Sequence, residues 1–567
     1  EHVRVATSCD RFQQYANRSD RHQHAGQRRF PVHHPDDRRC CHDHHPVHFH
    51  LYHWTETADP WNVLRSSQRL IPERTINPEH FFHRGKDIAV LQGLQFILYK
   101  KMKKEKIFQE EKKVMKKKII AAFLTAAMTI GSLSGVTVFA ADAGTDENVE
   151  MADASDVDGT TITFWHSMGG VNGEAIDTLV KKFNDENKYG ITVDAQYQGE
   201  YDDSLNKLKS AQIGNMGADL VQVYEIGTRF MIDSGWIVPM QQMVDADNYD
   251  VSEIEPNLAA YYTIDNELYS MPFNSSTPIM YYNKDMFDKA GITEVPDSLE
   301  GIGEIGQDLL DKGGAGEVMS LGIYGWFFEQ FIGKQGLEYA NNGNGRKDAA
   351  TAVAFDENGA AKNILTAWKD LNDKGFAPIV GKGGDAGLAD FSAGKAAITL
   401  GSTASLKQIL QDVNGKFEVG TAYFPKIKSS DEGGASIGGA SLWALNNNDP
   451  KKLRATWEFV KFLISPESQA YWNAQTGYFP VTVKAQDEQV FKDNVEKYPQ
   501  FQTAIDQLHD SSADYVGALL SVFQEARATV ESEIESMLNG KEDVDTAVKN
   551  MADSINKSIE EYNLVNE

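Results

Sequence analysis

Cysteine and histidine, which supply thiol nucleophiles and many metal ligands, lie almost entirely near the start of this 567-residue chain. All three cysteines (Cys9, Cys40 and Cys41) and 13 of the 15 histidines precede Met115, which leaves His166 and His509 for the rest. The 427 residues after residue 140 (567 − 140) therefore hold no thiol nucleophile, no disulfide and no cysteine-ligated zinc. Two histidines far apart in sequence are little material for a catalytic triad or a metal site. This inventory favours binding over catalysis, and we expect no catalytic residue, metal or cofactor.

Polar groups follow three predicted strands, in the runs Trp165-His166-Ser167, Gly199-Glu200-Tyr201 and Tyr224-Glu225. Ligands of α/β sheets bind at the carboxyl ends of the strands, so these three runs are where a binding site is expected. His166 by itself is better explained as a strand-end histidine with a satisfied hydrogen bond than as a ligand contact.

The elements that would position these runs alternate between strand and helix. Residues 160–165, 191–197 and 219–223 have the short apolar or alternating pattern of strands. Between them, Ile176, Leu179, Val180 and Phe183 have the spacing of one helix face, and a second helix is predicted from residue 202 to about 214. This β-α-β-α-β order predicts a sheet with helices on both faces.

A second α/β lobe is predicted farther along the chain. Residues 272–278 lead into a strand at 279–282, and a helix with Ile364, Trp368 and Leu371 on one face follows. Residues 417–424 and a strand near 442–445 are expected to return to the first lobe, and a helix through Trp457 to leave it again. Chain crossings of this kind make hinges.

Charge divides the chain into two parts. The whole chain carries 55 Lys and Arg against 82 Asp and Glu, and this acidic balance disfavours nucleic acid as a partner. Residues 1–140 have a net charge of +9 (23 basic, 14 acidic), and the remainder has −36 (32 basic, 68 acidic). We expect residues 1–114 to be a disordered leader, translated in frame from upstream nucleotides.

Residues 115–140 have the plan of a secretory signal peptide. Three lysines (Lys116 to Lys118) precede the apolar residues 119–138, and Val138-Phe139-Ala140 is a small-x-small cleavage pattern. No cysteine follows for lipid attachment, so we expect export to the periplasm or the cell surface without a lipid anchor. Two alternatives stay open: residues 119–138 could anchor the chain in a membrane, and His42 to His50 could form a metal-binding tract. Residues 141–158 are predicted to be an acidic, solvated linker.

Ordered motifs over residues 159–563 resemble extracellular solute-binding proteins of ABC importers, in particular the glycerol-3-phosphate-binding members of that family. The motifs are Thr163-Phe164-Trp165-His166-Ser167-Met168, Gln222-Val223-Tyr224-Glu225, Pro272-Phe273-Asn274-Ser275-Ser276-Thr277-Pro278, Tyr281-Tyr282-Asn283-Lys284-Asp285, Gly438-Gly439-Ala440-Ser441-Leu442-Trp443 and Thr476-Gly477-Tyr478.

The resemblance implies an α/β, two-lobed periplasmic-binding-protein fold of the type II kind, with discontinuous lobes joined by hinge crossings. We expect lobe 1 at residues 159–275 and 417–465, and lobe 2 at residues 276–416 and 466–563. It also implies a monomeric receptor that closes on one small solute and delivers it to a membrane permease.

Carried over position by position, the resemblance implies seven ligand-binding residues: Tyr201, Glu225, Ser276, Trp326, Ser402, Gly439 and Tyr478. A carboxylate can accept hydrogen bonds from glycerol or sugar hydroxyls, aromatic rings can supply apolar faces, and serine hydroxyls can donate to anionic oxygens. A glycine lets a ligand approach the backbone amide. The Ser402-Thr403-Ala404-Ser405 run precedes an apolar-periodic segment, so its amides could form a helix N-terminus that favours an anion.

One position departs from the family pattern. Gly517-Ala518-Leu519-Leu520 stands where the glycerol-3-phosphate binders have Gly-x-Arg-Leu, so Leu519 replaces an arginine that helps to hold the phosphate. We therefore expect a small polyol phosphate, a glycerophosphodiester or a carbohydrate as the ligand.

Two other classes of function would each require a feature of their own in the sequence. A secreted glycoside-processing enzyme would need two carboxylates facing each other in one pocket, and no acidic partner of Glu225 is evident in the matched positions. A surface adhesin would show repeats or a wall anchor, and neither is visible in the sequence.

Overall fold

The computed structural model describes residues 149–212, 217–511 and 515–566, which belong to one compact unit of the chain. The predicted leader, signal peptide, membrane anchor and histidine tract lie outside the described residues. Within the described residues, no helix is long and apolar enough to cross a bilayer.

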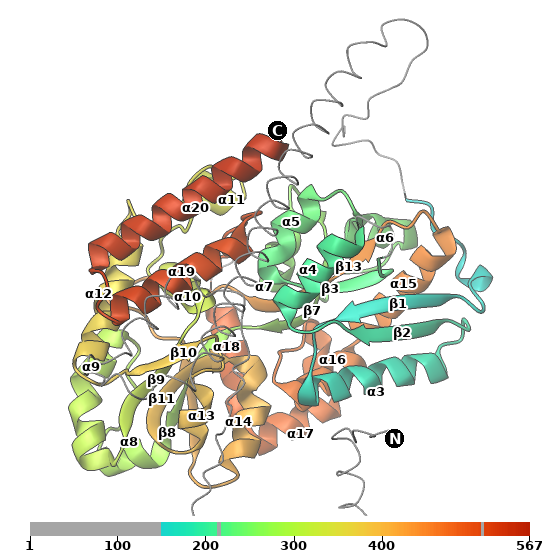
Figure 1. The fold of residues 1–567 in the computed structure, drawn as a ribbon. Helices are drawn as coiled ribbons and strands as arrows, with labels where there is room; N and C mark the ends of the chain where they lie inside the picture. The colour runs from blue at the N-terminus through green and yellow to red at the C-terminus, as the bar shows by residue number, and fades with distance from the viewer. Residues whose placement is uncertain (1–148, 213–216, 512–514, 567) are drawn as a thin grey trace, which may run out of the picture. The chain divides into compact units, whose positions relative to one another are not determined.

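The first sheet has six strands, in the order β2-β1-β3-β13-β4, with β7 also paired to β13 (Figure 1). Strands β1, β2 and β3 are parallel, whereas β13 runs antiparallel to β3, β4 and β7. The bounds are β1 Thr161–His166, β2 Thr192–Tyr197, β3 Leu220–Tyr224, β4 Ile237–Val238, β7 Met271–Ser276 and β13 Gly438–Leu445. A small hairpin, β5 Thr263–Ile264 with β6 Glu267–Leu268, stands apart from this sheet.

Helices cover the first sheet because each has an apolar stripe. In α3 the predicted face of Ile176, Leu179, Val180 and Phe183 is buried, and Phe183 packs edge-on against Phe459 of α15. The helices of this lobe are α3 Gly170–Glu186, α4 Tyr201–Gln212, α5 Thr228–Asp233, α6 Met240–Asp247, α7 Pro256–Tyr262, α15 Pro450–Leu463, α16 Pro466–Thr476 and α17 Gln489–Lys497.

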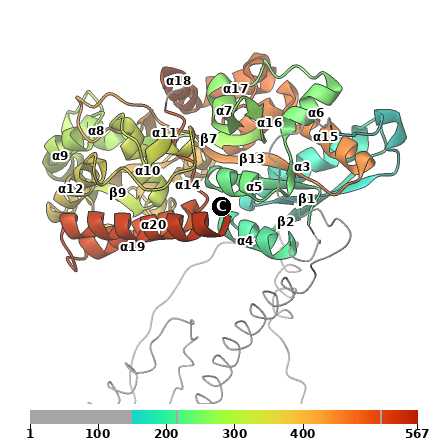
Figure 2. The same ribbon diagram turned by 90° about the horizontal axis from the view of Figure 1, so that it is seen from above.

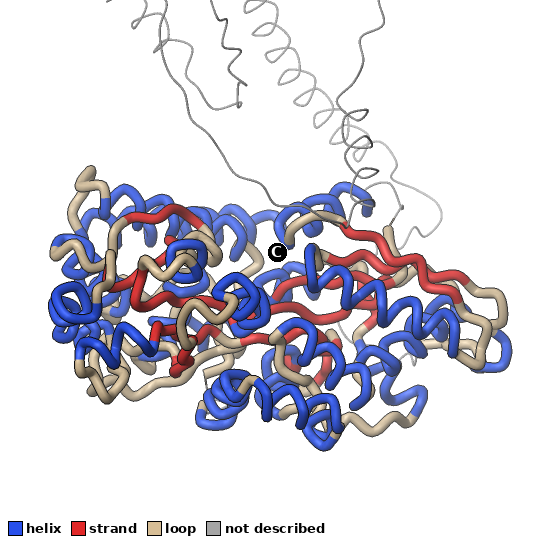
Figure 3. The backbone as a smooth tube through the Cα atoms, turned by 90° about the horizontal axis from the view of Figure 1, so that it is seen from below, coloured by secondary structure: helices blue, strands red, loops and turns tan. Residues whose placement is uncertain are grey.

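The second sheet has five strands, in the order β10-β9-β11-β8-β12. Their bounds are β8 Pro278–Asn283, β9 Glu317–Ile323, β10 Ile379–Lys382, β11 Ala396–Ser402 and β12 Val419–Tyr423. The helices of this lobe are α8 Lys284–Ala290, α9 Leu299–Asp308, α10 Gly325–Lys334, α11 Asn341–Gly345, α12 Ala360–Asp373, α13 Leu388–Ser392, α14 Leu406–Val413, α19 Phe523–Leu538 and α20 Val544–Asn566. In Figure 3 the strands run through the interior of the described chain, with most helices outside them. The two-lobed α/β architecture expected from the sequence is thus present.

The chain passes between the two sheets at three places. It leaves the first sheet at Thr277, between β7 and β8, and returns between β12 and β13. It leaves again after α18 (Gln502–Asp510), and α19 and α20 then pack beside α10 and α12 (Figure 2). The lobes are therefore discontinuous in sequence.

Two expectations about the lobes are wrong. Strand β12 pairs antiparallel with β8, from Val419 opposite Asn283 to Tyr423 opposite Ile279, so the chain has not yet returned to the first lobe at residue 417. Helix α16 belongs to the first lobe rather than the second, because Trp472 is fully buried there and stacks on Phe273 of β7. An apolar pattern along the chain does not specify the sheet against which an element packs.

The described part of the predicted acidic linker, residues 149–158, is docked on the first lobe. Val157 is completely buried, the Ala152 amide donates to the Pro450 carbonyl (3.0 Å), and Arg454 Nε donates to the Ala152 carbonyl (2.9 Å). The expectation of a free, solvated linker is therefore wrong for this segment, because the Ala152 backbone is hydrogen-bonded to α15 and Val157 is buried in the core of the first lobe, although the acidic side chains of the segment are exposed.

Gln507 of α18 joins two of the crossings. Its Oε1 accepts from the Phe424 amide and its Nε2 donates to the Pro278 carbonyl, both at 2.7 Å, and the side chain is buried. We expect Gln507→Ala to lower the free energy of unfolding by about 2–4 kcal/mol, since it leaves two buried backbone groups without partners. Gln502→Ala on the same helix removes only a hydrogen bond to Asp506 and should cost less than about 0.5 kcal/mol. Urea denaturation of both variants checks this, and equal losses would contradict it.

Candidate ligand-binding site

One cavity of about 530 Å³ is lined by both lobes and by all seven residues predicted to bind the ligand. Tyr201, Glu225, Ser276, Gly439 and Tyr478 come from the first lobe, and Trp326 and Ser402 come from the second. The three polar runs at the ends of β1, β2 and β3 also reach it, through Ser167, Glu200 and Tyr224 among others. Among the seven predicted residues, the structure brings together Tyr201 and Tyr478, which are 277 positions apart in sequence.

Tyr201 and Tyr478 form a polar and aromatic wall of the cavity. The Tyr201 hydroxyl accepts a hydrogen bond from Asn274 Nδ2 (2.8 Å) and lies 3.4 Å from the Tyr478 hydroxyl. Tyr201 stacks on Tyr224 with ring centroids 5.2 Å apart, and Tyr478 stacks on Trp472 at 5.6 Å. Burial raises the pKa of both hydroxyls above the ordinary tyrosine value, so both remain protonated donors at neutral pH.

Glu225 belongs to a buried ion triad that joins the two lobes. Arg527 of α19 donates from Nη2 to Glu225 Oε1 (2.5 Å) and from Nε to Glu329 Oε1 of α10 (2.6 Å), and Nη2 also reaches Glu329 Oε2 (2.9 Å). The side chains of Glu225 and Arg527 are 6% and 8% exposed. Burial would lower the pKa of Arg527, but the two carboxylates outweigh it and raise that pKa, while burial raises the pKa of Glu329. The Glu225 carboxyl group is therefore held in place by Arg527.

The two predicted serines are held by local structure. Ser402 caps the turn that leads into α14, because its Oγ accepts from the Ala404 amide (3.1 Å), and its carbonyl accepts from the Tyr281 hydroxyl (2.7 Å). Ser276 is the last residue of β7 and lies opposite Gly438 of β13, at the first crossing between the lobes. Both serines line the cavity, and Ser402 also serves as a cap.

Two adjacent glycines, Gly438 and Gly439, allow close packing beside the cavity because they have no side chain. Gly439 has a φ of +86°, and a Cβ there would lie 2.0 Å from the Asn274 carbonyl oxygen of the paired strand. A Cβ on Gly438 would lie 2.3 Å from the Trp326 ring, so this glycine makes the space that the indole occupies. Trp326 is 4% exposed, and its Nε1 has no hydrogen-bond partner within the described residues.

Several cavity residues were not assigned a role from the sequence. Ser167 and Glu200 follow β1 and β2, where the order of strands and helices indicates a site, and Asn172 lies in the first turn of α3. Asp385 follows β10 in the second lobe, and partial burial raises the pKa of its carboxyl. The cavity lining contains Glu200, Glu225 and Asp385 and no Lys, Arg or His, so its wall is acidic within the described residues.

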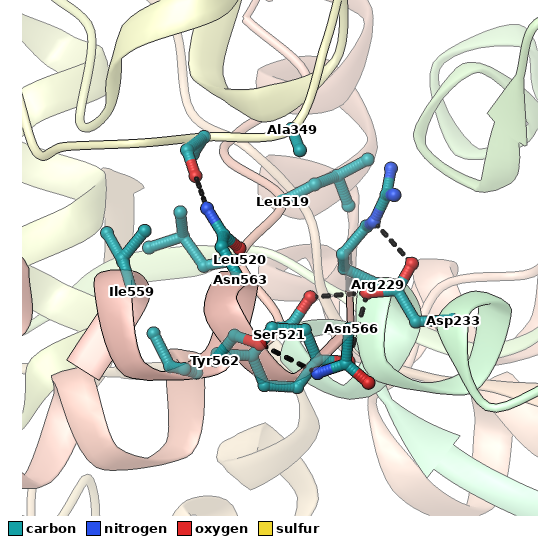
Figure 4. Close-up of a pocket in the computed structure, with 12 residues that line it drawn as sticks. Arg229, Asp233, Ala349, Leu519, Leu520, Ser521, Ile559, Tyr562, Asn563 and Asn566 are labelled. Atoms are coloured by element: carbon teal, nitrogen blue, oxygen red, sulfur yellow. Dashed lines mark hydrogen bonds and ion pairs between the residues drawn. The ribbon is translucent and has the colours of Figure 1, made fainter. Parts of the chain in front are cut away.

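Leu519 lies in a different cavity, of about 240 Å³. Figure 4 shows it beside Arg229 and Asp233 of α5 and close to α20, where Tyr562 and Ser521 both donate to Asp233 Oδ2, at 3.1 and 2.6 Å. Leu519 is therefore not among the residues that line the cavity of the seven predicted residues. The guanidinium bonded to a carboxylate of that lining is Arg527.

His166 lies behind the cavity wall, and its role is structural. Its Nδ1 accepts from the Met168 amide (3.3 Å), and its ring packs against Phe164 and Tyr197. Burial lowers its pKa to about 4, so the ring is neutral at physiological pH. The described residues contain no group of three His, Cys, Asp or Glu that could hold a metal ion.

A family model described as bacterial extracellular solute-binding protein matches residues 178–503, more than half of the chain. The chain belongs to this family. Its members are binding proteins rather than enzymes, and the glycoside-processing alternative falls with that assignment, although Glu200 and Asp385 do lie in the same cavity as Glu225.

Named relatives and solved structures agree with the assignment. The sn-glycerol-3-phosphate-binding periplasmic protein UgpB of Salmonella typhimurium is 33% identical over 415 residues, which cover 71% of this chain and 93% of UgpB. The crystal structure of UgpB from Mycobacterium tuberculosis in complex with glycerophosphocholine has a TM-score of 0.61 at 23% identity, and covers 71% of this chain and 99% of that one. The GacH receptor of Streptomyces glaucescens, solved unliganded and with acarbose, has a TM-score of 0.59 at 21% identity, with 71% and 98% covered. These structures support the two-lobed fold.

Gly439 and Gly159 both have positive φ, of +86° and +75°, but only Gly439 has an atom in the way of a Cβ. Gly159→Ala should lower the free energy of unfolding by about 1 kcal/mol, which is the backbone strain alone. Gly439→Ala should lower it by more than about 3 kcal/mol, because the new methyl group also forces β7 away from β13. Urea denaturation of the two variants measures the difference, and similar losses would show that the close approach is relaxed in solution.

The lowered pKa of His166 predicts a pH dependence of stability. Below about pH 6.5 the unfolded state binds a proton that the folded state does not take up until about pH 4, so this contribution to stability falls as the pH drops through that interval. The loss should reach about 2–3 kcal/mol. His166→Asn keeps an acceptor near the Met168 amide and does not titrate, so its unfolding free energy should fall less than that of the wild type between pH 6.5 and 4.5. Parallel pH profiles for the two proteins would contradict the prediction.

Proposed function

We propose that this chain is an exported receptor that captures one small hydroxylated solute, a carbohydrate or a glycerophospho compound, between its two lobes. The observation that carries the proposal is a cavity to which both lobes contribute and which all seven predicted residues line. UgpB of Salmonella typhimurium is named for binding sn-glycerol 3-phosphate, and the solved complexes of the structural relatives contain glycerophosphocholine and acarbose. Each of these ligands carries two or more hydroxyl groups.

The groups in the cavity suit such a ligand. Glu225 is fixed by Arg527, and a fixed carboxylate is a strong acceptor for sugar or glycerol hydroxyls. The protonated hydroxyls of Tyr201 and Tyr478 can donate, and the rings of Tyr201, Tyr478 and Trp326 offer apolar faces to a carbon skeleton.

Charge in the cavity ranks the candidate solutes. Three carboxylates line it, and the nearest guanidinium, Arg527, is already shared by Glu225 and Glu329. A phosphomonoester carries close to two negative charges at neutral pH and would be repelled by these carboxylates. A neutral saccharide, or a phosphodiester with a single negative charge, is disfavoured less. We therefore rank carbohydrates and glycerophosphodiesters above glycerol 3-phosphate.

Hinge motion provides the means of capture. The three crossings between the sheets are the places where the lobes can rotate, and the Arg527 triad links the lobes beside the cavity. A ligand that contacts both lobes stabilises the closed arrangement in proportion to its differential affinity for that arrangement. The closed, loaded form is then the one recognised by a membrane permease.

The remaining details of this proposal follow from the sequence. We propose export by the segment 115–140 to the periplasm or cell surface without a lipid anchor, a monomeric state, and no nucleic-acid partner in view of the net charge of −27. With the corrections given by the fold, we propose lobe 1 at residues 149–276 and 438–511 and lobe 2 at residues 278–423 and 523–566.

A thermal-shift panel tests the function. Maltose, glycerophosphocholine and glycerol 3-phosphate are added in turn, and a bound solute should raise the melting temperature by mass action. Glu225→Gln and Tyr478→Phe should each weaken a positive hit, by about tenfold for the charged carboxylate and about threefold for the hydroxyl. Tyr423→Phe is the matched control, because Tyr423 is partly exposed and donates to Asp510 outside the cavity. Hits that survive both cavity variants unchanged would overturn the assignment of this cavity.

A further inference from the structure

One carboxylate in the lining of the solute cavity has no partner. Three carboxylates line that cavity, those of Glu200, Glu225 and Asp385. Glu225 is bonded to Arg527 (2.5 Å), and Glu200 accepts a hydrogen bond from the Tyr197 hydroxyl (3.4 Å). The side chain of Asp385 has no hydrogen bond and no ion pair with any residue that the structure describes. It comes from the second lobe and is not one of the seven residues predicted from the family resemblance.

The loop that carries Asp385 is held tightly against the second sheet. The Gly383 amide donates to the carbonyl of Ile323, the last residue of β9 (2.8 Å). A Cβ on Gly387 would lie only 2.4 Å from the Ser320 carbonyl oxygen, so the loop packs directly on the backbone of β9. These contacts fix the point from which the Asp385 side chain enters the cavity. An acceptor that is already in place loses little conformational entropy when a solute binds to it.

The carboxyl group of Asp385 is open to the cavity and yet surrounded by protein. The residue is exposed to solvent, and it is part of the cavity lining, so a solute can reach it. The protein around it nevertheless removes part of its hydration, which raises the pKa of the carboxyl group, and no neighbouring cation or hydrogen-bond donor opposes that rise. A solute hydroxyl that donates to this carboxylate would replace the hydration that the protein has removed.

The charge of Asp385 acts on side chains of both lobes. Burial is the main cause of the raised pKa of Tyr281 in the second lobe and of Tyr478 in the first, and the negative charge of Asp385 raises both further. Tyr478 and Tyr324 line the same cavity, and Gly384 leaves room for the Tyr324 ring, which would lie 3.1 Å from a Cβ on that glycine. A solute held between the lobes would therefore bind within the field of this carboxylate.

An unpaired carboxylate in such a cavity selects solutes by their charge. It accepts hydrogen bonds from hydroxyl groups, and a hydrogen bond to a charged acceptor is stronger than one between neutral groups. It repels a phosphate group, because two like charges that are close together and partly shielded from water raise the free energy. The cavity lining contains no Lys or Arg that would offset the charge of Asp385, and Arg527 is not part of that lining.

We propose that Asp385 is a specificity-determining residue of the second lobe, whose carboxylate accepts hydrogen bonds from hydroxyl groups of the solute and excludes solutes that place a phosphate group beside it. This inference rests on the proposed function and narrows it to one residue and one chemistry. The part of the solute that meets the second lobe is then an uncharged polyol. Glu225 does not make this selection alone, because it is bonded to the guanidinium of Arg527.

Asp385→Asn tests the inference by isothermal titration, because it keeps the size of the side chain and removes its charge. The probes are maltose and glycerophosphoglycerol, which both present hydroxyl groups, and glycerol 3-phosphate. The hydroxylated probe that binds the wild type should bind the variant about fivefold more weakly, since a neutral amide oxygen replaces a charged acceptor. Glycerol 3-phosphate should bind the variant about tenfold more tightly, since the repulsion is gone. A misfolded variant would bind every probe more weakly, so opposite signs identify the effect of charge.

Two further variants serve as controls. Asp390→Asn is the same substitution five positions along the chain, in α13, where Asp390 accepts from Lys395 Nζ (2.8 Å) outside the cavity, and it should change the affinity for neither class of probe. Asp385→Glu keeps the charge but lengthens the side chain. It should weaken the hydroxylated probe without any gain in affinity for glycerol 3-phosphate, which separates the role of the charge from the role of side-chain shape.

The outcomes separate this inference from the proposed function. If no saccharide and no glycerophospho compound binds the wild type, the proposed function fails and the role of Asp385 with it. If a hydroxylated probe binds, but Asp385→Asn leaves its affinity unchanged or shifts it in the same direction as that of glycerol 3-phosphate, the role of Asp385 alone is overturned. A loss confined to glycerophosphocholine would overturn it as well, because the carboxylate would then pair with the cationic head group instead of with hydroxyl groups.

Discussion

A buried charge shared between two lobes is the constraint on which the site depends. Glu225 begins the turn that follows β3 of the first lobe, Glu329 and Arg527 come from two helices of the second, and all three are largely shielded from water. Removing one member of such a group leaves an uncompensated buried charge, which typically costs about 3–5 kcal/mol. The triad therefore ties the orientation of the Glu225 carboxylate to the packing of α10 and α19, so the carboxylate is fixed only while the lobes are in contact.

The rest of the cavity follows from the way the chain crosses between sheets. Ser276 stands at the first crossing, and Gly438 and Gly439 begin the strand that follows the second. The Asn274 backbone lies so close to Gly439 that it excludes a side chain there, and the indole of Trp326 from the second lobe excludes one at Gly438. Residues at the crossings between the lobes thus also border the cavity. A ligand bound against them therefore contacts both lobes. This coupling is what a receptor needs if binding is to bias the closed arrangement.

The helices and strands of the first lobe and the position of the candidate site could be predicted from the sequence, because they depend on residue patterns within short segments. The spacing of Ile176, Leu179, Val180 and Phe183 predicts helix α3. The polar residues after β1, β2 and β3 predict where the candidate site lies. Other features depend on long-range packing. The pattern of β12 predicts a strand but not its pairing with β8, Arg527 meets Glu225 across 302 positions, and the acidic residues 149–158 dock through backbone bonds that composition does not reveal. The family motif identifies Leu519 as the position of a missing arginine, but only the three-dimensional arrangement shows that Leu519 lines another cavity.

The central claim is that a small hydroxylated solute binds between the lobes, against Tyr201, Glu225 and Tyr478. The most direct test is a crystal structure of the protein grown with the saccharide or glycerophosphodiester that binds it best. We predict continuous density for the intact solute in this cavity, with a hydroxyl within hydrogen-bond distance of Glu225. Density in the cavity beside Leu519 instead, or a solute cleaved into its parts, would contradict the account.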